Sequence, residues 1–212
     1  MILLKELYDE LRWIDETLLG EKYPLTWDAD EFSRISSFAG RVRYAKTNLQ
    51  FLKGGSGRLV YRVDDEKVLK LAKNQKGIAQ NKVEIKGYTQ WGHDILAKLF
   101  NYDKNGLWVE MELAKKMTLP EFKRITGVTF EDFTEILRYA YDRSYRYHVK
   151  GDEDAVWNSE IYTDVEYFMA MADMPAGDLT AKSAYGIVKR DGKDKVVIID
   201  YGLNHDVWDS YY

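Results

Sequence analysis

The sequence predicts an α+β fold in which short antiparallel strands, joined by tight turns, precede and follow a helical region. Residues 54–72 contain a Gly-rich turn, a strand, the polar turn of residues 64–66 and a second strand. Toward the end of the chain, β-branched runs flank Asp191-Gly192. This pair is a strong hairpin signal, because a primed turn needs positive φ. Residues 115–175 lie between these strands and are expected to be helical.

Length and composition limit the classes of protein to be considered. The 212 residues fit one domain, or one domain built of two lobes, with 45% hydrophobic and 31% charged residues. The net charge of −4 favours neither a nucleic-acid nor a membrane partner. The chain has no cysteine, which excludes disulfides and thiolate metal sites. It also shows no signal-peptide pattern and no apolar run long enough to span a bilayer, so we expect a cytoplasmic protein.

Two helices are expected before the first strand. Residues 2–19 have apolar side chains at helical spacing, and Gly20 ends the pattern. A second helix is expected from about Ala29 to Leu52. Either helix could bind a partner, but packing on the body of the fold is the favoured interpretation. The second helix is expected to place five apolar residues inward: Phe32, Ile35, Phe38, Val42 and Leu49.

Lys70 stands in the middle of the apolar strand VLKLA. A buried ammonium group needs a partner or an anionic ligand, because burying it alone is costly. The helix expected at residues 78–90 offers Glu84 as that partner. The alternative is an edge-strand lysine that points into solvent. The glycines of the preceding turn could similarly leave amide groups free for a phosphate, or form an ordinary flexible turn.

The order of the remaining elements adds to this pattern. Residues 96–103 and 107–114 are expected to be two more strands, separated by a turn at residues 104–106. Thr129 can cap a helix. That helix would carry one apolar face: Phe133, Ile136, Leu137, Ala140 and Tyr141.

Two carboxylates flank the C-terminal hairpin. Asp178 precedes it, and Asp200 follows an apolar strand directly and is itself followed by Tyr201-Gly202. Together with the Gly-rich turn, Lys70 and Glu84, this order resembles the protein-kinase fold. Small kinase-like proteins encoded by bacteriophages have a similar sequence pattern. The resemblance covers roughly residues 50–205. It implies an N-terminal helical extension at residues 1–50, a small antiparallel-sheet N-lobe at 51–114, and a reduced helical C-lobe at 115–212.

The resemblance also implies roles for individual residues. The ligand would be ATP with Mg²⁺. Lys70, held by Glu84, would contact the phosphates, Asp178 would accept the proton of the attacking hydroxyl, and Asp200 would bind the metal. The remaining positions would surround the nucleotide: Gly55 and Gly57 over the phosphates, Val60 over the base, Met111 at the back of the base pocket, and the backbone of Glu112 and Ala114 on adenine.

The sequence departs from the kinase pattern at several positions. A kinase Gly loop has a third Gly before its Val, whereas Arg58-Leu59-Val60 closes this turn early. Ala176-Gly177 replaces the usual His-Arg before the catalytic Asp. The position of the Asn that holds a second Mg²⁺ falls on Ser183 or, with a longer loop, on Tyr185. Because only ten residues follow Gly202, the activation segment and the substrate-binding helices are expected to be missing.

Three hypotheses follow from the sequence. The first is a minimal ATP-dependent phosphotransferase whose acceptor is unknown. The second is a pseudokinase that binds a nucleotide or a protein partner without transferring phosphate. The third is an α+β structural protein with coincidental matches, and it is the least favoured.

Overall fold

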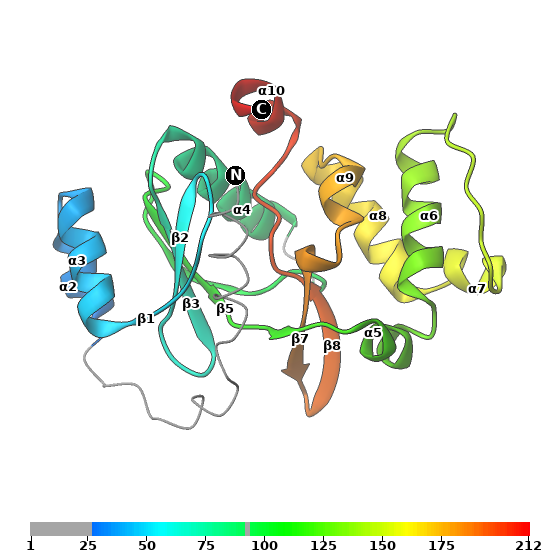
Figure 1. The fold of residues 1–212 in the computed structure, drawn as a ribbon, viewed down its shortest axis with the longest axis horizontal. Coiled ribbons are helices and arrows are strands. Elements are labelled where there is room, and N and C mark those ends of the chain that lie inside the picture. The colour runs from blue at the N-terminus through cyan, green and yellow to red at the C-terminus, as the bar shows by residue number, and fades with distance from the viewer. Residues whose placement is uncertain (1–26, 92–93) are drawn as a thin grey trace, which may run out of the picture.

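The computed structural model describes residues 27–91 and 94–212, and it has the predicted α+β class (Figure 1). A five-stranded antiparallel sheet has the strand order β1-β2-β3-β5-β4. Helix α4 connects β3 to β4 along the chain and packs on β3. The bounds of these elements are β1 Gln50–Gly54, β2 Arg58–Arg62, β3 Lys67–Ala72, α4 Gln75–Trp91, β4 Leu99–Tyr102 and β5 Trp108–Glu112.

From residue 113 onward the chain is mainly helical and carries a second, three-stranded sheet of order β6-β7-β8. The predicted hairpin is present: β7 and β8 are antiparallel, and Asp191 and Gly192 both have positive φ, 52° and 77°. The strands are β6 Lys115–Lys116, β7 Tyr185–Arg190 and β8 Lys193–Ile198. The helices are α5 Leu119–Thr126, α6 Phe130–Tyr141, α7 Glu153–Trp157, α8 Glu160–Ala172, α9 Ala176–Leu179, the 3₁₀ helix η2 Lys182–Ala184, and α10 His205–Tyr211.

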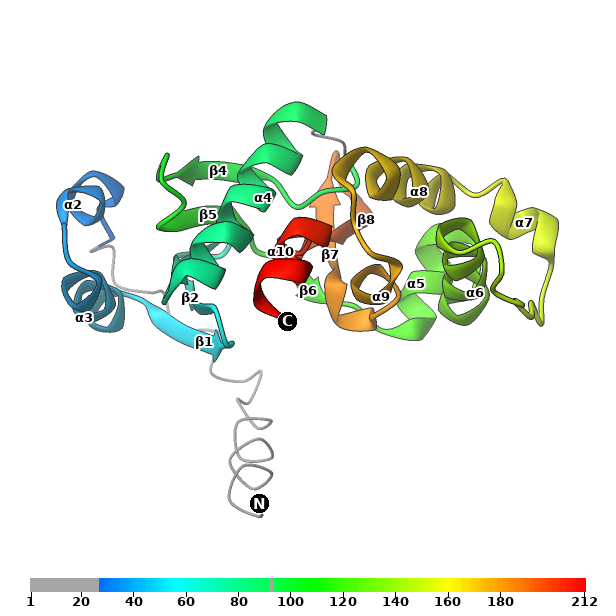
Figure 2. The same cartoon turned by 90° about the horizontal axis from the view of Figure 1, so that it is seen from above.

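The two sheets are joined by the segment before β4. Leu96 forms a parallel bridge with Ile198, and the Ala97 N–H donates to the Ile198 carbonyl at 2.9 Å. An ion pair of 2.6 Å between Arg190 and Glu112 links β7 to β5. In the view of Figure 2, the five-stranded sheet and the helical part lie side by side, and α10 lies between them. This junction fixes the end of β8 relative to the first sheet.

Helices α2 and α3 correct the predicted long helix of residues 29–52. The structure has two helices, α2 Ala29–Arg34 and α3 Phe38–Asn48, because Ile35 is extended and Ser37 caps α3 through the Gly40 N–H. β1 then begins at Gln50, inside the range expected to be helical and one residue before the expected lobe boundary. Phe38 was expected to face inward but is exposed, whereas Phe32 is fully buried.

The predicted helical region begins after β6 and contains α5 to α8. Thr129 caps α6 as expected, accepting from the Asp132 N–H at 3.1 Å. Most of the expected apolar face of α6 is buried, but Tyr141 at its end is exposed. Within the described ranges no helix is long and apolar enough to cross a membrane. The helix predicted at residues 2–19 lies outside the described residues, and the division of the chain into lobes stays a prediction.

Candidate functional site

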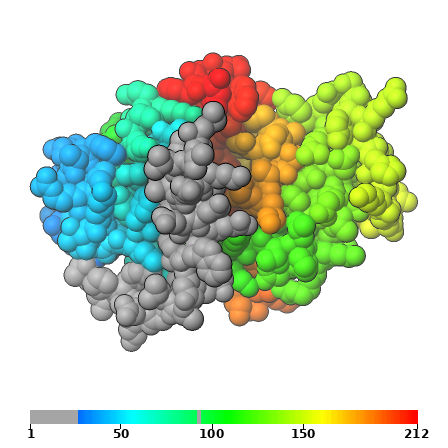
Figure 3. All heavy atoms as spheres, in the orientation of Figure 1, coloured from blue at the N-terminus to red at the C-terminus, as the bar shows by residue number. Residues whose placement is uncertain are grey.

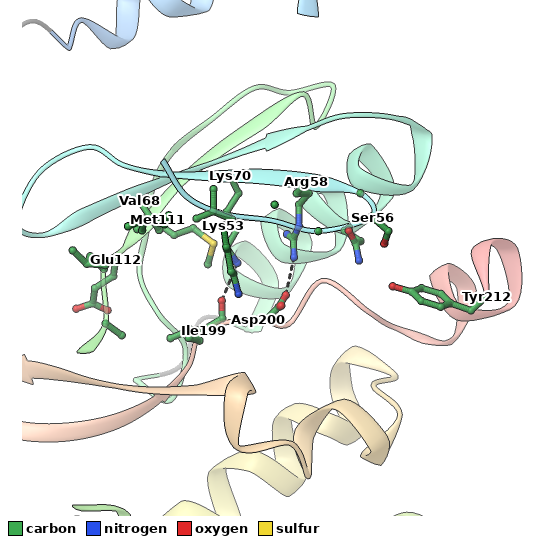
Figure 4. A pocket seen from close by; sticks show the side chains of 18 residues that line it. Lys53, Ser56, Arg58, Val68, Lys70, Met111, Glu112, Ile199, Asp200 and Tyr212 are labelled. Atoms are coloured by element: carbon green, nitrogen blue, oxygen red, sulfur yellow. Dashed lines mark hydrogen bonds and ion pairs between the residues drawn. The ribbon is translucent and has the colours of Figure 1, made fainter. Parts of the chain in front are cut away.

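A pocket of about 450 Å³ lies between the Gly-rich turn, the inner face of the first sheet and the end of β8. Figure 4 shows Val68, Met111 and Glu112 at one end and Ser56 and Tyr212 at the other. The side chains between these ends are largely charged. The lining residues are Leu52, Lys53, Gly54, Gly55, Ser56, Gly57, Arg58, Val60, Val68, Lys70, Gln80, Met111, Glu112, Leu113, Ala114, Ile199, Asp200 and Tyr212.

Lys70 reaches the pocket because side chains alternate along β3. Leu69 and Leu71 are buried on the opposite face of the sheet with Trp108, so Lys70 points inward. Its Nζ lies 2.6 Å from Glu84 Oε1 on α4 and donates to the Ile199 carbonyl at 2.8 Å. Burial lowers the pKa of Lys70, and the negative charge of Glu84 opposes that shift. The predicted ion pair is therefore present, and the edge-strand alternative is excluded.

Arg58 extends this pair into a cluster of four charges. Its Nη1 lies 2.8 Å from Glu84 Oε2, a close ion pair without the alignment of a hydrogen bond. The same nitrogen donates to Asn81 Oδ1 at 3.3 Å, and Nη2 donates to Asp200 Oδ1 at 2.7 Å. Burial would lower the pKa of Arg58, but Glu84 and Asp200 hold it above its ordinary value. Arg58 is therefore a permanent cation inside the pocket.

Asp200 lies two residues after the end of β8, and its carboxylate is held by the ion pair with Arg58. Its side chain keeps 48% of its surface exposed although many protein atoms surround it, because it borders the pocket. Burial alone would raise the pKa of Asp200, but Arg58, Lys70 and Lys53 together hold that pKa at about 2. The carboxylate is consequently ionised at any physiological pH.

The Gly-rich turn is anchored through its carbonyl groups to the two residues just before α4. The Gly57 carbonyl accepts from the Lys73 N–H at 2.8 Å, and the Ser56 carbonyl accepts from Asn74 Nδ2 at 3.0 Å. A Cβ on Gly77 would lie 2.1 Å from the Gly57 oxygen, so position 77 needs glycine, and a Cβ on Gly57 would lie a tight 3.1 Å from the Gly77 nitrogen. Within the described part of the chain, the N–H groups of Ser56 and Gly57 have no acceptor. The turn therefore combines fixed carbonyls with free donors that can bind an anion.

The other end of the pocket has an apolar wall. Met111 is almost fully buried and lines the pocket, and Val60 and Val68 lie on the same wall. The Glu112 side chain pairs with Arg190, and the Glu112 N–H donates to the Lys98 carbonyl at 2.8 Å. Among the described residues the Ala114 N–H has no acceptor. This edge offers a flat apolar ligand both contact area and a backbone donor.

Asp178 and Ser183 are not among the residues that line the pocket. Asp178 lies half-buried in α9; burial and then the charge of Asp200 raise its pKa, so the two carboxylates interact. Ser183 is exposed in η2. The alternative prediction, that Tyr185 takes the place of the second metal ligand, is wrong. Tyr185 is buried, and its hydroxyl donates to the Leu179 carbonyl at 2.7 Å. The ring of Tyr185 packs among Phe122, Phe130 and Phe133, and Tyr185 is not among the residues that line the pocket.

The lining residues that the sequence did not identify include Lys53, Arg58 and Tyr212. Lys53 was missed because the second helix was expected to run to Leu52, so no strand was predicted before the Gly-rich turn and the Lys53 side chain had no predicted direction. Arg58 was treated only as the residue that closes the turn early. The sequence does contain a signal for Arg58, because a basic residue stands between the last glycine of the turn and the apolar pair Leu59-Val60.

The donor set fits one magnesium ion. Mg²⁺ is usually held by one or two carboxylates together with substrate phosphates and water. Asp200 offers its second oxygen, Oδ2, which has no partner among the described residues. Over residues 27–91 and 94–212, no group of three or more His, Cys, Asp and Glu side chains could hold a metal ion alone. A ligand's own phosphates would therefore have to complete the coordination.

Comparisons with known proteins give weak similarities. No protein-family model matches the sequence, and no curated protein matches it significantly. Similar solved structures include SAICAR synthase from Saccharomyces cerevisiae in complex with SAICAR, at 12% identity and a TM-score of 0.38 over 74% of each chain. A choline/ethanolamine kinase family protein from Mesorhizobium loti gives 15% and 0.33, over 82% of this chain and 64% of the other. APH(2″)-IIa in a ternary complex with streptomycin and ATP gives 10% and 0.35, over 84% and 73%.

Because similarities this low carry no argument about activity, the class of fold rests on the geometry of the chain. A Gly-rich turn covers the pocket, the third-strand Lys70 pairs with Glu84 of the following helix, and Asp200 follows two residues after the end of β8. These are parts that protein kinases place around ATP. The chain therefore has a kinase-like α+β fold.

Proposed function

We propose that this chain binds ATP in the pocket beneath the Gly-rich turn and transfers its γ-phosphate to an acceptor. One observation carries the proposal: the free donors of the turn, the Lys70–Glu84 pair and Asp200 all border one pocket. Its volume of about 450 Å³ is within the range of small-molecule sites. The resemblance to bacteriophage-encoded proteins and the cytoplasmic location stay predictions.

The residues would divide the work as follows. The adenine ring would lie between Val60 and Met111, with the Ala114 N–H as a donor at its edge. Lys70 and the turn amides would bind the phosphates. Asp200 would hold one Mg²⁺, which in such sites neutralises charge on the phosphates. An added Cβ on Gly55 would meet no protein atom closer than 4.0 Å, so the chain itself does not require glycine there. Gly55 would instead leave room for the phosphates.

Asp178 would accept the proton from the attacking hydroxyl. A general base works best when its pKa lies near the operating pH, and burial together with Asp200 moves the pKa of Asp178 in that direction. Its place in α9, beside the pocket and not within its lining, is where an acceptor would have to enter. The identity of that acceptor stays unassigned.

A second candidate function is nucleotide binding without transfer. It is favoured by two observations: Arg58 already neutralises Asp200, and Ser183 does not line the pocket. A protein of this kind would act as a nucleotide-dependent partner-binding protein.

A thermal-shift titration with ATP, with and without Mg²⁺, followed by a γ-phosphate transfer assay, tests the proposal. We expect ATP to raise the melting temperature of the wild type. Asp178→Asn should keep that shift and lose any transfer. Binding with no transfer in the wild type would favour the second candidate, and the absence of any ATP shift would contradict both.

A further inference from the structure

Arg58 joins three elements at one point in the pocket. It is the first residue of β2, it is 8% exposed, and it contacts Asn81 and Glu84 of α4 and Asp200 after β8. Figure 4 shows its guanidinium group pointing from the sheet toward Asp200, on the same side as Lys53 and Lys70. Neither the glycines nor the Lys70–Glu84 pair requires an arginine here.

The guanidinium group of Arg58 has donors left over. An arginine carries five N–H groups in a planar fork. Nη1 faces Asn81 and Glu84, and one N–H of Nη2 points at Asp200. The second Nη2 donor and the Nε donor are not used by these contacts. Arg58 can therefore donate to a ligand oxygen in the pocket while it stays paired with Asp200.

The pocket needs positive charge that metal ions alone do not supply. A triphosphate brings several negative charges, and Asp200 adds another. Two carboxylates are among the described lining residues, Asp200 and Glu112, and Glu112 is paired with Arg190, which leaves Asp200 as the carboxylate available to a metal. Three cations of the chain line the same pocket: Lys53, Arg58 and Lys70.

We propose that Arg58 is a phosphate-binding residue that takes the place of a second metal ion, so that the pocket retains nucleoside triphosphates after Mg²⁺ is removed. The inference rests on the proposed function, since it assumes that the ligand is a nucleotide. Arginine suits this role because its planar fork binds phosphate and carboxylate oxygens at once and cannot lose its proton.

Calorimetric titration of ATP, in Mg²⁺ and in EDTA, tests the proposal on the wild type, Arg58→Gln and Arg58→Lys. The matched control is Arg62→Gln, on the same strand but paired with the exposed Asp65 outside this pocket. We expect chelation to weaken wild-type binding by about tenfold or less, and Arg58→Gln to lose about a further tenfold or more in EDTA. Arg58→Lys should fall between them, and Arg62→Gln should match the wild type within about twofold.

Tripolyphosphate, which has no base, separates this inference from the proposed function. Metal-free tripolyphosphate binding that depends on Arg58, with ATP binding no tighter, would support Arg58 and contradict the adenine site. Equal metal-free affinities in wild type and Arg58→Gln would overturn the inference and leave the proposed function standing. Complete loss of wild-type binding in EDTA would overturn it too, and that result needs no variant to fold. If neither ligand binds under any condition, both proposals fall.

Discussion

At the scale of single residues, the pocket is built on one buried acid that serves two bases. Glu84 is fully buried and faces Lys70 at 2.6 Å and Arg58 at 2.8 Å. Arg58 also forms an ion pair with Asp200, whose side chain is half-exposed. Removing Glu84 therefore leaves two cations without their shared partner, whereas removing Lys70 leaves Glu84 still paired.

We accordingly predict that Glu84→Gln lowers the free energy of unfolding by about 3–5 kcal/mol, and Lys70→Met by less. The control Asp65→Asn breaks an exposed pair with Arg62 and should cost below about 1 kcal/mol. Urea unfolding of the three variants measures these losses in the free energy of unfolding. Equal losses for Glu84→Gln and Lys70→Met would show that Arg58 does not share the acid.

Asp200 predicts a pH dependence of stability. Its pKa in the folded protein is about 2, below the ordinary 3.8, so the unfolded state takes up the proton more readily. The stabilisation from the ionised carboxylate is therefore complete above about pH 4 and is lost as the pH falls toward 2. Thermal unfolding should show wild type and Asp200→Asn converging over that interval. A difference independent of pH would contradict the pairing with Arg58.

The sequence identified Lys70, Glu84 and Asp200 because each breaks a local pattern: a charge in an apolar strand, an acid on the next helix, or an acid ending a strand. It could not place Lys53 or Arg58. Their directions depend on the pairing of β1 with β2, in which Lys53 stands opposite Val60 across an irregular register. That register is a tertiary property that no short pattern contains.

At the scale of elements, packing against α4 fixes the position of the Gly-rich turn. Gly57 and Gly77 bring the turn and α4 into direct backbone contact. Position 87 of the same helix is different, because an added Cβ would meet the rings of Tyr201 and Phe168 at ordinary contact distances of 3.5 Å and 3.6 Å. The helix thus offers two glycines whose replacement by alanine should have opposite effects.

We predict that Gly77→Ala destabilises the protein by about 1–3 kcal/mol, despite the better helix propensity of alanine, because the Cβ would overlap Gly57. Gly87→Ala should stabilise it by about 0.5–1 kcal/mol. Gly77→Ala should also weaken ATP binding by displacing the turn, and Gly87→Ala should not. Chemical unfolding and an ATP titration of both variants check this, and the same sign for both would contradict the contact.

Helices α2 and α3 cover the outer face of the five-stranded sheet. Phe32 lies against Trp27, Tyr44 and Trp108, with ring centroids 4.9, 5.9 and 5.6 Å away. The apolar periodicity of residues 29–52 does not reveal where the helix stops, because Leu49 and Leu52 fit a strand as well as a helix. The break at residues 35–37 comes from the cap at Ser37, which competes with continuing the helix.

Phe32→Ala should therefore cost about 3–5 kcal/mol, since it empties a fully buried aromatic site. The matched variant Phe38→Ala, expected from the sequence to be equally severe, should change stability by about 0.5 kcal/mol or less because that side chain is exposed. Urea unfolding distinguishes them. Similar losses would mean that the continuous helix was the better interpretation.

At the scale of the whole molecule, the pocket lies where two parts of different architecture meet. In Figure 3, α2, α3 and the first strands (blue to cyan) occupy one end, the helices α5 to α8 (green to yellow) the other, and α10 (red) lies at the top between them. The pairing of Leu96 with Ile198 places Asp200 opposite Lys70, although the two are far apart in the sequence. The order of elements in the sequence predicted this arrangement, but it contained no information on contacts such as the pairing of Leu96 with Ile198, which join the two parts.

The position of α10 was the least predictable feature at this scale. Ten residues after Gly202 gave no reason to expect an element beside the pocket, yet α10 packs on α4 and Tyr212 lines the pocket. Lys76 on α4 lies 3.3 Å from the centre of the Tyr212 ring. The pairing of a short helix with a distant surface is decided by complementarity of shape, which periodicity does not report.

Hydrogen exchange with and without ATP and Mg²⁺ tests the central claim most directly, because it reports where a ligand binds. If ATP occupies the pocket, exchange should slow at the amides of Ser56, Gly57 and Ala114, which have no acceptor among the described residues. Exchange in α7 and α8, at residues 153–172, should stay unchanged and serve as the internal control. Unaltered exchange at those three amides under saturating ATP, or slowing confined to the control helices, would contradict the account.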